Sequence, residues 1–96
     1  MRPSLKLAER RDDVLALAAA HGASRVRVFG SVARGGDREG SDIDLLVDVP
    51  PGTSLLTLVG LQQDLEDALG FKVDLCTESE LHAALRGRIL AEAQPL

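Results

Sequence analysis

The apolar residues of this chain show two kinds of spacing, one typical of strands and one typical of helices. In Arg25–Phe29 polar and apolar side chains alternate, which is typical of a strand that buries one face. Asp42–Val47 alternates in the same way at its start, and Phe71–Cys76 is a third segment of strand-forming residues. Two longer segments, about Pro3–Ala20 and Ser54–Leu69, place their apolar residues at helical intervals instead. The pattern predicts a small α+β domain.

Each expected helix has recognisable ends. The first begins near a proline, ends before Gly22 and turns four apolar residues inward, namely Leu7, Val14, Leu17 and Ala18. The second ends at Gly70 and carries a wider stripe, made of Leu55, Leu58, Leu61, Gln62, Leu65, Ala68 and Leu69. The last opens with a candidate capping box, Thr77-Glu78-Ser79-Glu80, and presents one stripe of Leu81, Leu85 and Ile89.

Two connections decide how the strands pair. The loop Arg34–Ser41 is rich in glycine and charge and is too short for a parallel crossover, so we expect the first two strands to be antiparallel. The helix over Ser54–Leu69 is long enough for a right-handed crossover, so the third strand should run parallel to the second. The sequence thus predicts a three-stranded mixed sheet in the order 1-2-3, packed with helices.

Acidic residues gather at one edge of this predicted sheet. Asp42 and Asp44 are two residues apart, so on a strand their side chains point to the same face. Asp74 lies in the third strand, and the topology brings it next to this pair. Carboxylates so close together repel unless a cation lies between them, and Mg²⁺ prefers oxygen ligands. An isolated D-x-D more often marks a solvated strand face, but the convergence of three carboxylates favours a metal site.

A glycine and a serine follow the first strand directly. Gly30 allows the backbone to approach a ligand, and Ser31 is suited to cap a short helical turn over Val32–Arg34. Backbone N–H groups at such a turn can bind phosphate. Alone, these residues would more often form an ordinary strand-to-helix turn. Beside the carboxylates they indicate a phosphate site, and Arg34 is a further candidate for phosphate contact, although an arginine in a charged loop is often only solvated.

These segments resemble the minimal nucleotidyltransferases of the DNA polymerase β superfamily. The resemblance rests on the string Val28–Gly35, on Ser41–Val47, and on the interval of ten residues between Gly30-Ser31 and the acidic pair, and it spans about residues 25–76. In that family the Gly-Ser turn holds a nucleoside triphosphate and three carboxylates hold two Mg²⁺ ions. The resemblance therefore implies nucleotide contacts at Gly30 and Ser31, and catalytic and metal-binding roles for Asp42, Asp44 and Asp74.

The resemblance also implies a reaction and a partner. Stand-alone prokaryotic members often act as antitoxins beside a HEPN-domain ribonuclease toxin, transferring AMP from ATP to a toxin tyrosine. We therefore expect a protein adenylyltransferase that uses ATP with Mg²⁺, or Mn²⁺ in its place, by two-metal-ion catalysis. Two alternatives stay open: nucleotidylation of a small molecule such as an aminoglycoside, and an antitoxin that inhibits by binding alone. The complete acidic set argues against binding alone, and the lack of an acceptor-binding domain argues against a small molecule.

Composition narrows the remaining choices. A chain of 96 residues is expected to form one domain over residues 1–96 and to rely on a partner to complete its site. The net charge is −4, and without the three candidate metal ligands the remainder is nearly neutral, which argues against strong non-specific binding to nucleic acid. A single Cys76 permits no internal disulfide, and no secretory or membrane segment is apparent, so we expect a cytoplasmic protein. Neither His21 nor His82 has a partner at metal-ligand spacing.

Overall fold

The alternating segments form one mixed β-sheet in a computed structural model that describes residues 1–96. Its strands are β1 (Ser24–Phe29), β2 (Ile43–Asp48), β3 (Val73–Cys76) and β4 (Gln94–Pro95), in the order β3-β2-β1-β4. β1 pairs antiparallel with β2, and β2 pairs parallel with β3. The predicted α+β class, the strand directions and the order of the first three strands are therefore confirmed.

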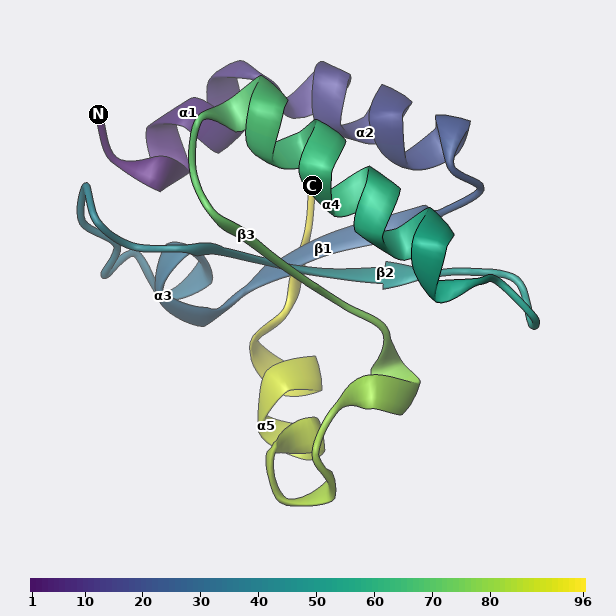
Figure 1. The fold of residues 1–96 in the computed structure, drawn as a ribbon. Coiled ribbons are helices and arrows are strands. Elements are labelled where there is room, and N and C mark those ends of the chain that lie inside the picture. Colours follow the sequence, from purple (N-terminus) through teal and green to yellow (C-terminus); the bar gives the residue numbers. More distant parts are fainter.

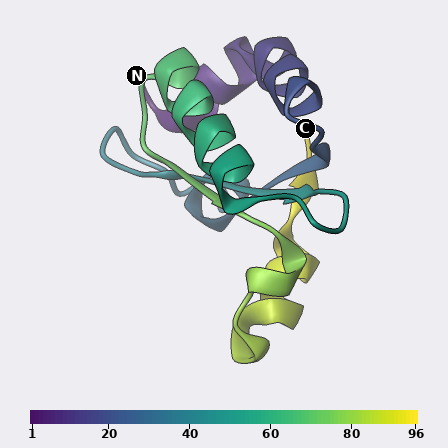
Figure 2. The same cartoon turned by 45° about the vertical axis from the view of Figure 1, so that its right-hand side comes forward.

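Helices cover the two faces of the sheet unequally (Figure 1). α1 (Pro3–Glu9), α2 (Arg11–Ala20) and the long α4 (Leu55–Leu69) lie together on one face. The short α3 (Gly30–Arg34) follows β1, and a 3-10 turn, η1 (Glu78–Glu80), precedes α5 (Ala83–Glu92). Figure 2 shows α5 extending away from the opposite face of the sheet. None of the helices is both long and apolar enough to cross a membrane.

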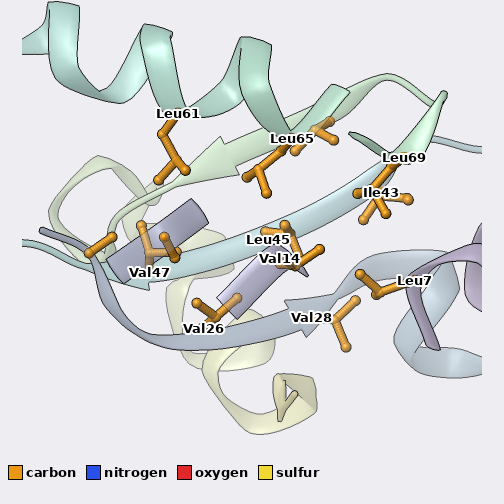
Figure 3. Close-up of a cluster of buried hydrophobic side chains, with 13 residues drawn as sticks. Leu7, Val14, Val26, Val28, Ile43, Leu45, Val47, Leu61, Leu65 and Leu69 are labelled. Atoms are coloured by element: carbon orange, nitrogen blue, oxygen red, sulfur yellow. The ribbon is translucent and has the colours of Figure 1, made fainter. Parts of the chain in front are cut away.

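The core lies between the sheet and the helices α2 and α4. Three leucines of α4 lie over the inner face of β2 (Figure 3), namely Leu61, Leu65 and Leu69, each at most 1% exposed. Alternation along β2 sends Ile43, Leu45 and Val47 into this core. The same alternation sends Asp44 to the opposite face, the side on which α5 lies. Burial of the apolar residues thus fixes which way the candidate catalytic carboxylate points.

The fourth strand is a correction to the prediction, which gave the sheet three strands. Gln94 and Pro95 pair antiparallel with Val28 and Arg27 of β1, and the amide of Leu96 donates to the carbonyl of Val26 over 3.1 Å. A strand of two residues is too short to show any alternation. Proline also lacks an N–H to donate, so it is tolerated in an edge strand, but its presence in a sequence argues against predicting a strand there.

Three helical predictions also need correction. The first helix is broken at Arg10, whose backbone has φ −105° and ψ 18°, and the sequence there has no glycine, proline or capping side chain to signal the break. Leu55, which was predicted to belong to the apolar stripe of the second helix, is 71% exposed, because the first turn of α4 follows directly on the loop after β2. The capping box of Thr77 and Glu80 is present, but it caps η1, and α5 begins later with the ring of His82 accepting from Ala84 N–H.

Candidate active site

Asp44 lies at the centre of the candidate site. It is paired in register with Asp74 of β3 and, across the other edge of β2, with Phe29 of β1. Neighbouring strands are about 4.8 Å apart, so the side chains of Asp44 and Asp74 project side by side from the same face. Asp42 is exposed and stands one residue before β2, two positions from Asp44. The structure therefore brings the three predicted carboxylates to one end of the sheet.

The charges of these residues act on one another. Partial burial, together with the negative charges of Asp74 and Asp42, raises the pKa of Asp44 to about 6, although the positive charge of Arg34 opposes this rise. Near neutral pH a large share of Asp44 is nevertheless ionised next to two other carboxylates. Such an arrangement stores repulsion that a bound cation would relieve.

The donor set suits a hard divalent cation, although the side chains do not form a closed cage. No group of three or more His, Cys, Asp or Glu side chains stands close enough together to hold a metal ion by itself. Mg²⁺ differs from zinc in this respect, because it is usually held by one or two carboxylates together with substrate phosphates and water. An Asp44–Asp74 pair with Asp42 nearby supplies oxygen ligands of this kind, so the residues fit Mg²⁺ brought in with a nucleotide.

Gly30 is required at its position for two reasons. Its φ is +72°, a left-handed conformation that side chains disfavour. A Cβ atom added there would overlap Oδ2 of Asp44 and lie only 3.1 Å from its Cγ. The turn after β1 is thus packed directly against the Asp44 carboxylate, which places the predicted phosphate turn and the predicted metal ligand in contact.

The predicted cap of α3 is wrong. The helix begins at Gly30, its N-cap position is Phe29, and no side chain of the first turn caps it, so Ser31 is not the N-cap. The reason is that the helix starts two residues earlier than expected, at Gly30 rather than Val32, and its first amide has a distant partner. The Gly30 N–H donates to Oε1 of Glu92, at the end of α5, over 3.0 Å.

Glu92 also pairs with Arg34. Nη1 of Arg34 lies 3.2 Å from Oε1 and 3.1 Å from Oε2 of Glu92. Arg34 therefore lies at the end of the turn, and its guanidinium is paired with a carboxylate. Its contact with phosphate stays a prediction. Sequence reasoning missed Glu92, because 62 residues separate it from Gly30 and nothing in the pattern of α5 singles it out.

A second carboxylate that the sequence did not indicate holds the loop between the turn and Asp42. The side chain of Asp37 is fully buried, and its Oδ2 accepts from Ser4 N–H over 2.8 Å. Arg2 donates to Oδ1 over 3.0 Å and to the backbone oxygen of Gly35 over 3.2 Å. Burial alone would raise the pKa of Asp37, but these hydrogen bonds lower it below its usual value. The N-terminus thereby fixes the loop that leads into Asp42.

Cys76 lies beside the third carboxylate rather than in the core. It is only partly buried, and its Sγ is 4.0 Å from Oδ1 of Asp74. Burial and then the charge of Asp74 raise the pKa of this thiol to about 11. Cys76 therefore stays a neutral thiol at physiological pH. The prediction that it cannot form an internal disulfide holds, because the chain has one cysteine.

The largest hollow of the molecule, about 650 Å³, lies elsewhere. It is lined by the end of β2 and the following loop, by η1, and by Leu55 and Leu58 of α4. None of the three candidate metal ligands lines it. Asp42 and Asp74 are instead exposed and Asp44 is half-buried, so the carboxylates are open to solvent on one side, which suits a charged nucleotide held through phosphates and metal ions rather than through enclosure.

Comparison with known proteins finds a matching family and similar sequences. Residues 11–96 match the family model described as nucleotidyltransferase domain. A protein of Methanocaldococcus jannaschii named putative protein adenylyltransferase is 42% identical, covering 93% of this chain and 96% of that protein. The protein adenylyltransferase MntA of Thermococcus cleftensis is 41% identical over 74% of this chain and 72% of its own length.

Solved structures agree with the sequence comparison. A structure described as a putative minimal nucleotidyltransferase superposes with a TM-score of 0.86 at 52% identity, covering 97% of this chain and 95% of the other. A toxin-antitoxin crystal structure with AMP-PNP reaches a TM-score of 0.76 over 88% of this chain and 69% of the other chain, at 22% identity. This second likeness is one of fold.

Proposed function

This chain belongs to the nucleotidyltransferase domain family, as an enzyme of the minimal type, and we propose that it transfers AMP from ATP to a hydroxyl group of a partner protein. The observation that carries this proposal is the contact of the Gly30 turn with Asp44, which is itself paired with Asp74. A phosphate-binding turn and oxygen ligands for Mg²⁺ are thereby adjacent, as transfer of a nucleotidyl group requires.

Each residue of the site has a proposed part. Asp42, Asp44 and Asp74 would hold Mg²⁺, which supplies charge neutralisation of the triphosphate and lowers the pKa of an attacking hydroxyl. Asp74 stands at the outer edge of the carboxylate group on an exposed strand position, where it can help to accept the proton of that hydroxyl. Gly30 and Ser31 present the turn to the β- and γ-phosphates, and Arg34 adds positive charge there.

The reaction is a displacement at the α-phosphorus of ATP. The partner's hydroxyl oxygen forms a bond to this phosphorus as the bond to the bridging oxygen of pyrophosphate breaks. The hydroxyl proton passes to a carboxylate or to solvent, and pyrophosphate carries away the negative charge. By the family resemblance, Asp42, Asp44 and Asp74 would hold two Mg²⁺ ions that neutralise the charge that develops on the phosphates.

The partner we propose is a toxin of the HEPN type, modified on a tyrosine, with this chain as the antitoxin in the cytoplasm. Two findings support this choice. Two relatives that cover most of the chain are named protein adenylyltransferases, one of them MntA. The net charge of −4 also disfavours a nucleic-acid acceptor.

Incubation with ATP, MgCl₂ and the protein encoded beside this gene tests the proposal. Intact-mass spectrometry should show the addition of AMP to that protein, and peptide mapping should place it on a tyrosine or another hydroxyl. The modification should be lost in Asp44→Asn and kept in a control variant, Asp67→Asn, which removes one charge from an exposed position. Asp37→Asn is not a suitable control, because Asp37 anchors the fold. Modification of RNA or of an aminoglycoside with the protein untouched would reject this proposal.

A further inference from the structure

Glu92 occupies the donors that the proposed function assigns to phosphate. Its carboxylate accepts from the Gly30 N–H over 3.0 Å and from Nη1 of Arg34 over 3.1 and 3.2 Å. The Glu92 side chain is 20% exposed, so the contact is partly shielded from solvent. The hydrogen bond from Gly30, with help from Arg34, lowers the pKa of Glu92, so the group at this position is an anion.

The single N–H of Gly30 cannot donate a good hydrogen bond to two anions at once. A phosphate oxygen that accepts from the Gly30 N–H must take the place of Oε1 of Glu92. The two anions would also repel each other, and Glu92 already adds to the negative charge around Asp44. Binding of a triphosphate at this turn and the present position of Glu92 therefore exclude one another.

The helix that carries Glu92 is suited to move. No residue of α5 is buried, and the helix projects from the sheet in both views (Figure 1, Figure 2). Leu85, near its start, is 48% exposed. Beyond Glu92, the chain is held by the short pairing of β4 with β1. Release of the carboxylate would thus disturb little packing, because α5 contributes little to the core.

From these contacts we propose that Glu92 is a built-in competitor of the nucleotide's β- and γ-phosphates, displaced when ATP binds with Mg²⁺ and returned when pyrophosphate leaves. The inference rests on the proposed function, since it assumes that the Gly30 turn binds the triphosphate. Its consequence is that nucleotide affinity is held down by an internal anion, and that the position of α5 depends on whether the site is filled.

Calorimetric titration of Glu92→Gln tests the competition. Glutamine keeps an oxygen that can accept from the Gly30 N–H, but it loses the charge that attracts Arg34. The dissociation constant for ATP with MgCl₂ should fall by about fivefold, the effect of exchanging a charged acceptor for a neutral one at a partly exposed site. AMP, which lacks the β- and γ-phosphates, should bind with nearly unchanged affinity.

Glu9→Gln is the matched control, because it removes the same charge from an exposed position at the end of α1. Its ATP affinity should equal that of the wild type. Equal or weaker ATP binding by Glu92→Gln, in a protein whose circular dichroism is unchanged, would overturn the competition and leave Glu92 as a brace of the turn. Binding by neither the wild type nor Glu92→Gln would overturn the proposed function as well.

Hydrogen exchange of the wild-type protein gives a second test that needs no variant. On addition of ATP with MgCl₂, the amides of residues 83–92 should exchange faster, because α5 loses its contact through Glu92. Slower or unchanged exchange in this segment, while ATP is bound, would contradict the displacement.

Discussion

Replacement of Asp44 by asparagine should stabilise the metal-free protein while removing its function. The change keeps the shape of the side chain and removes the charge that Asp74 and Asp42 repel. The pKa of Asp44 rises from 3.8 to about 6 in the folded protein. About two pKa units correspond to at most about 3 kcal/mol, and because the carboxyl is only partly buried, solvent screening reduces the expected gain to about 1 kcal/mol.

The size of the effect depends on pH. Because the folded protein binds the Asp44 proton more tightly than the unfolded chain, the penalty is complete well above pH 6 and is relieved as the pH falls from about 6 to below 3.8. Thermal melting in EDTA, followed by circular dichroism, should give Asp44→Asn a midpoint about 4–8 °C above the wild type near pH 8. The difference should shrink near pH 4.

Asp48→Asn provides a control with the opposite sign. Asp48 lies in the same strand, but it accepts from Nη2 of Arg27 over 2.8 Å, and the Arg27 side chain is only 7% exposed. Loss of this charge should destabilise the protein by about 1–2 kcal/mol. If Asp44→Asn melts below the wild type near pH 8, or if its advantage does not depend on pH, the electrostatic account of the site is wrong.

Three further predictions concern the site. Asp74→Asn should abolish AMP transfer yet keep measurable ATP binding, whereas Asp42→Asn should weaken both transfer and binding. Transfer by Asp74→Asn at a near wild-type rate would show that the third carboxylate is misassigned. ATP should bind in calorimetry with MgCl₂ and not in EDTA, because three carboxylates would otherwise face the triphosphate, so equal affinity would exclude the metal. Gly30→Ala should lose nucleotide binding and about 1–2 kcal/mol of stability, because the position has a positive φ and the added Cβ overlaps Asp44. Gly87→Ala, in open space on α5, should be neutral or slightly stabilising. Equal melting temperatures of the two variants would refute the steric argument.

The parts of the fold that the sequence predicted depend on local rules. The length and composition of the loop over residues 34–41 decided that β1 and β2 are antiparallel, and the crossover helix decided that β3 is parallel to β2. With those directions set, alternation within β2 placed Asp44 on the face away from the core. The meeting of Gly30, Asp44 and Asp74 then followed from topology, without any knowledge of side-chain positions.

The parts that the sequence did not predict depend on contacts between distant segments. β4 is two residues long and has no period to detect. Glu92 and Asp37 look like ordinary charged residues, and only the folded chain brings them to Gly30 and Ser4. The break at Arg10 likewise has no local signal. Ser31 was wrongly predicted as the N-cap because serine is preferred there by local sequence rules, whereas in the structure the carboxylate of the distant Glu92 accepts from the first amide of the helix.

The central claim is that this protein transfers AMP, and no other part of ATP, to a partner protein through the carboxylates around Asp44. ATP labelled either at the α-phosphate or at the γ-phosphate tests it directly, with the protein encoded beside this gene as acceptor. We expect the α-label alone to appear on the acceptor, only with Mg²⁺ or Mn²⁺ present, and not with Asp44→Asn. Transfer of the γ-label, or α-labelling that persists in EDTA or with Asp44→Asn, would contradict the account.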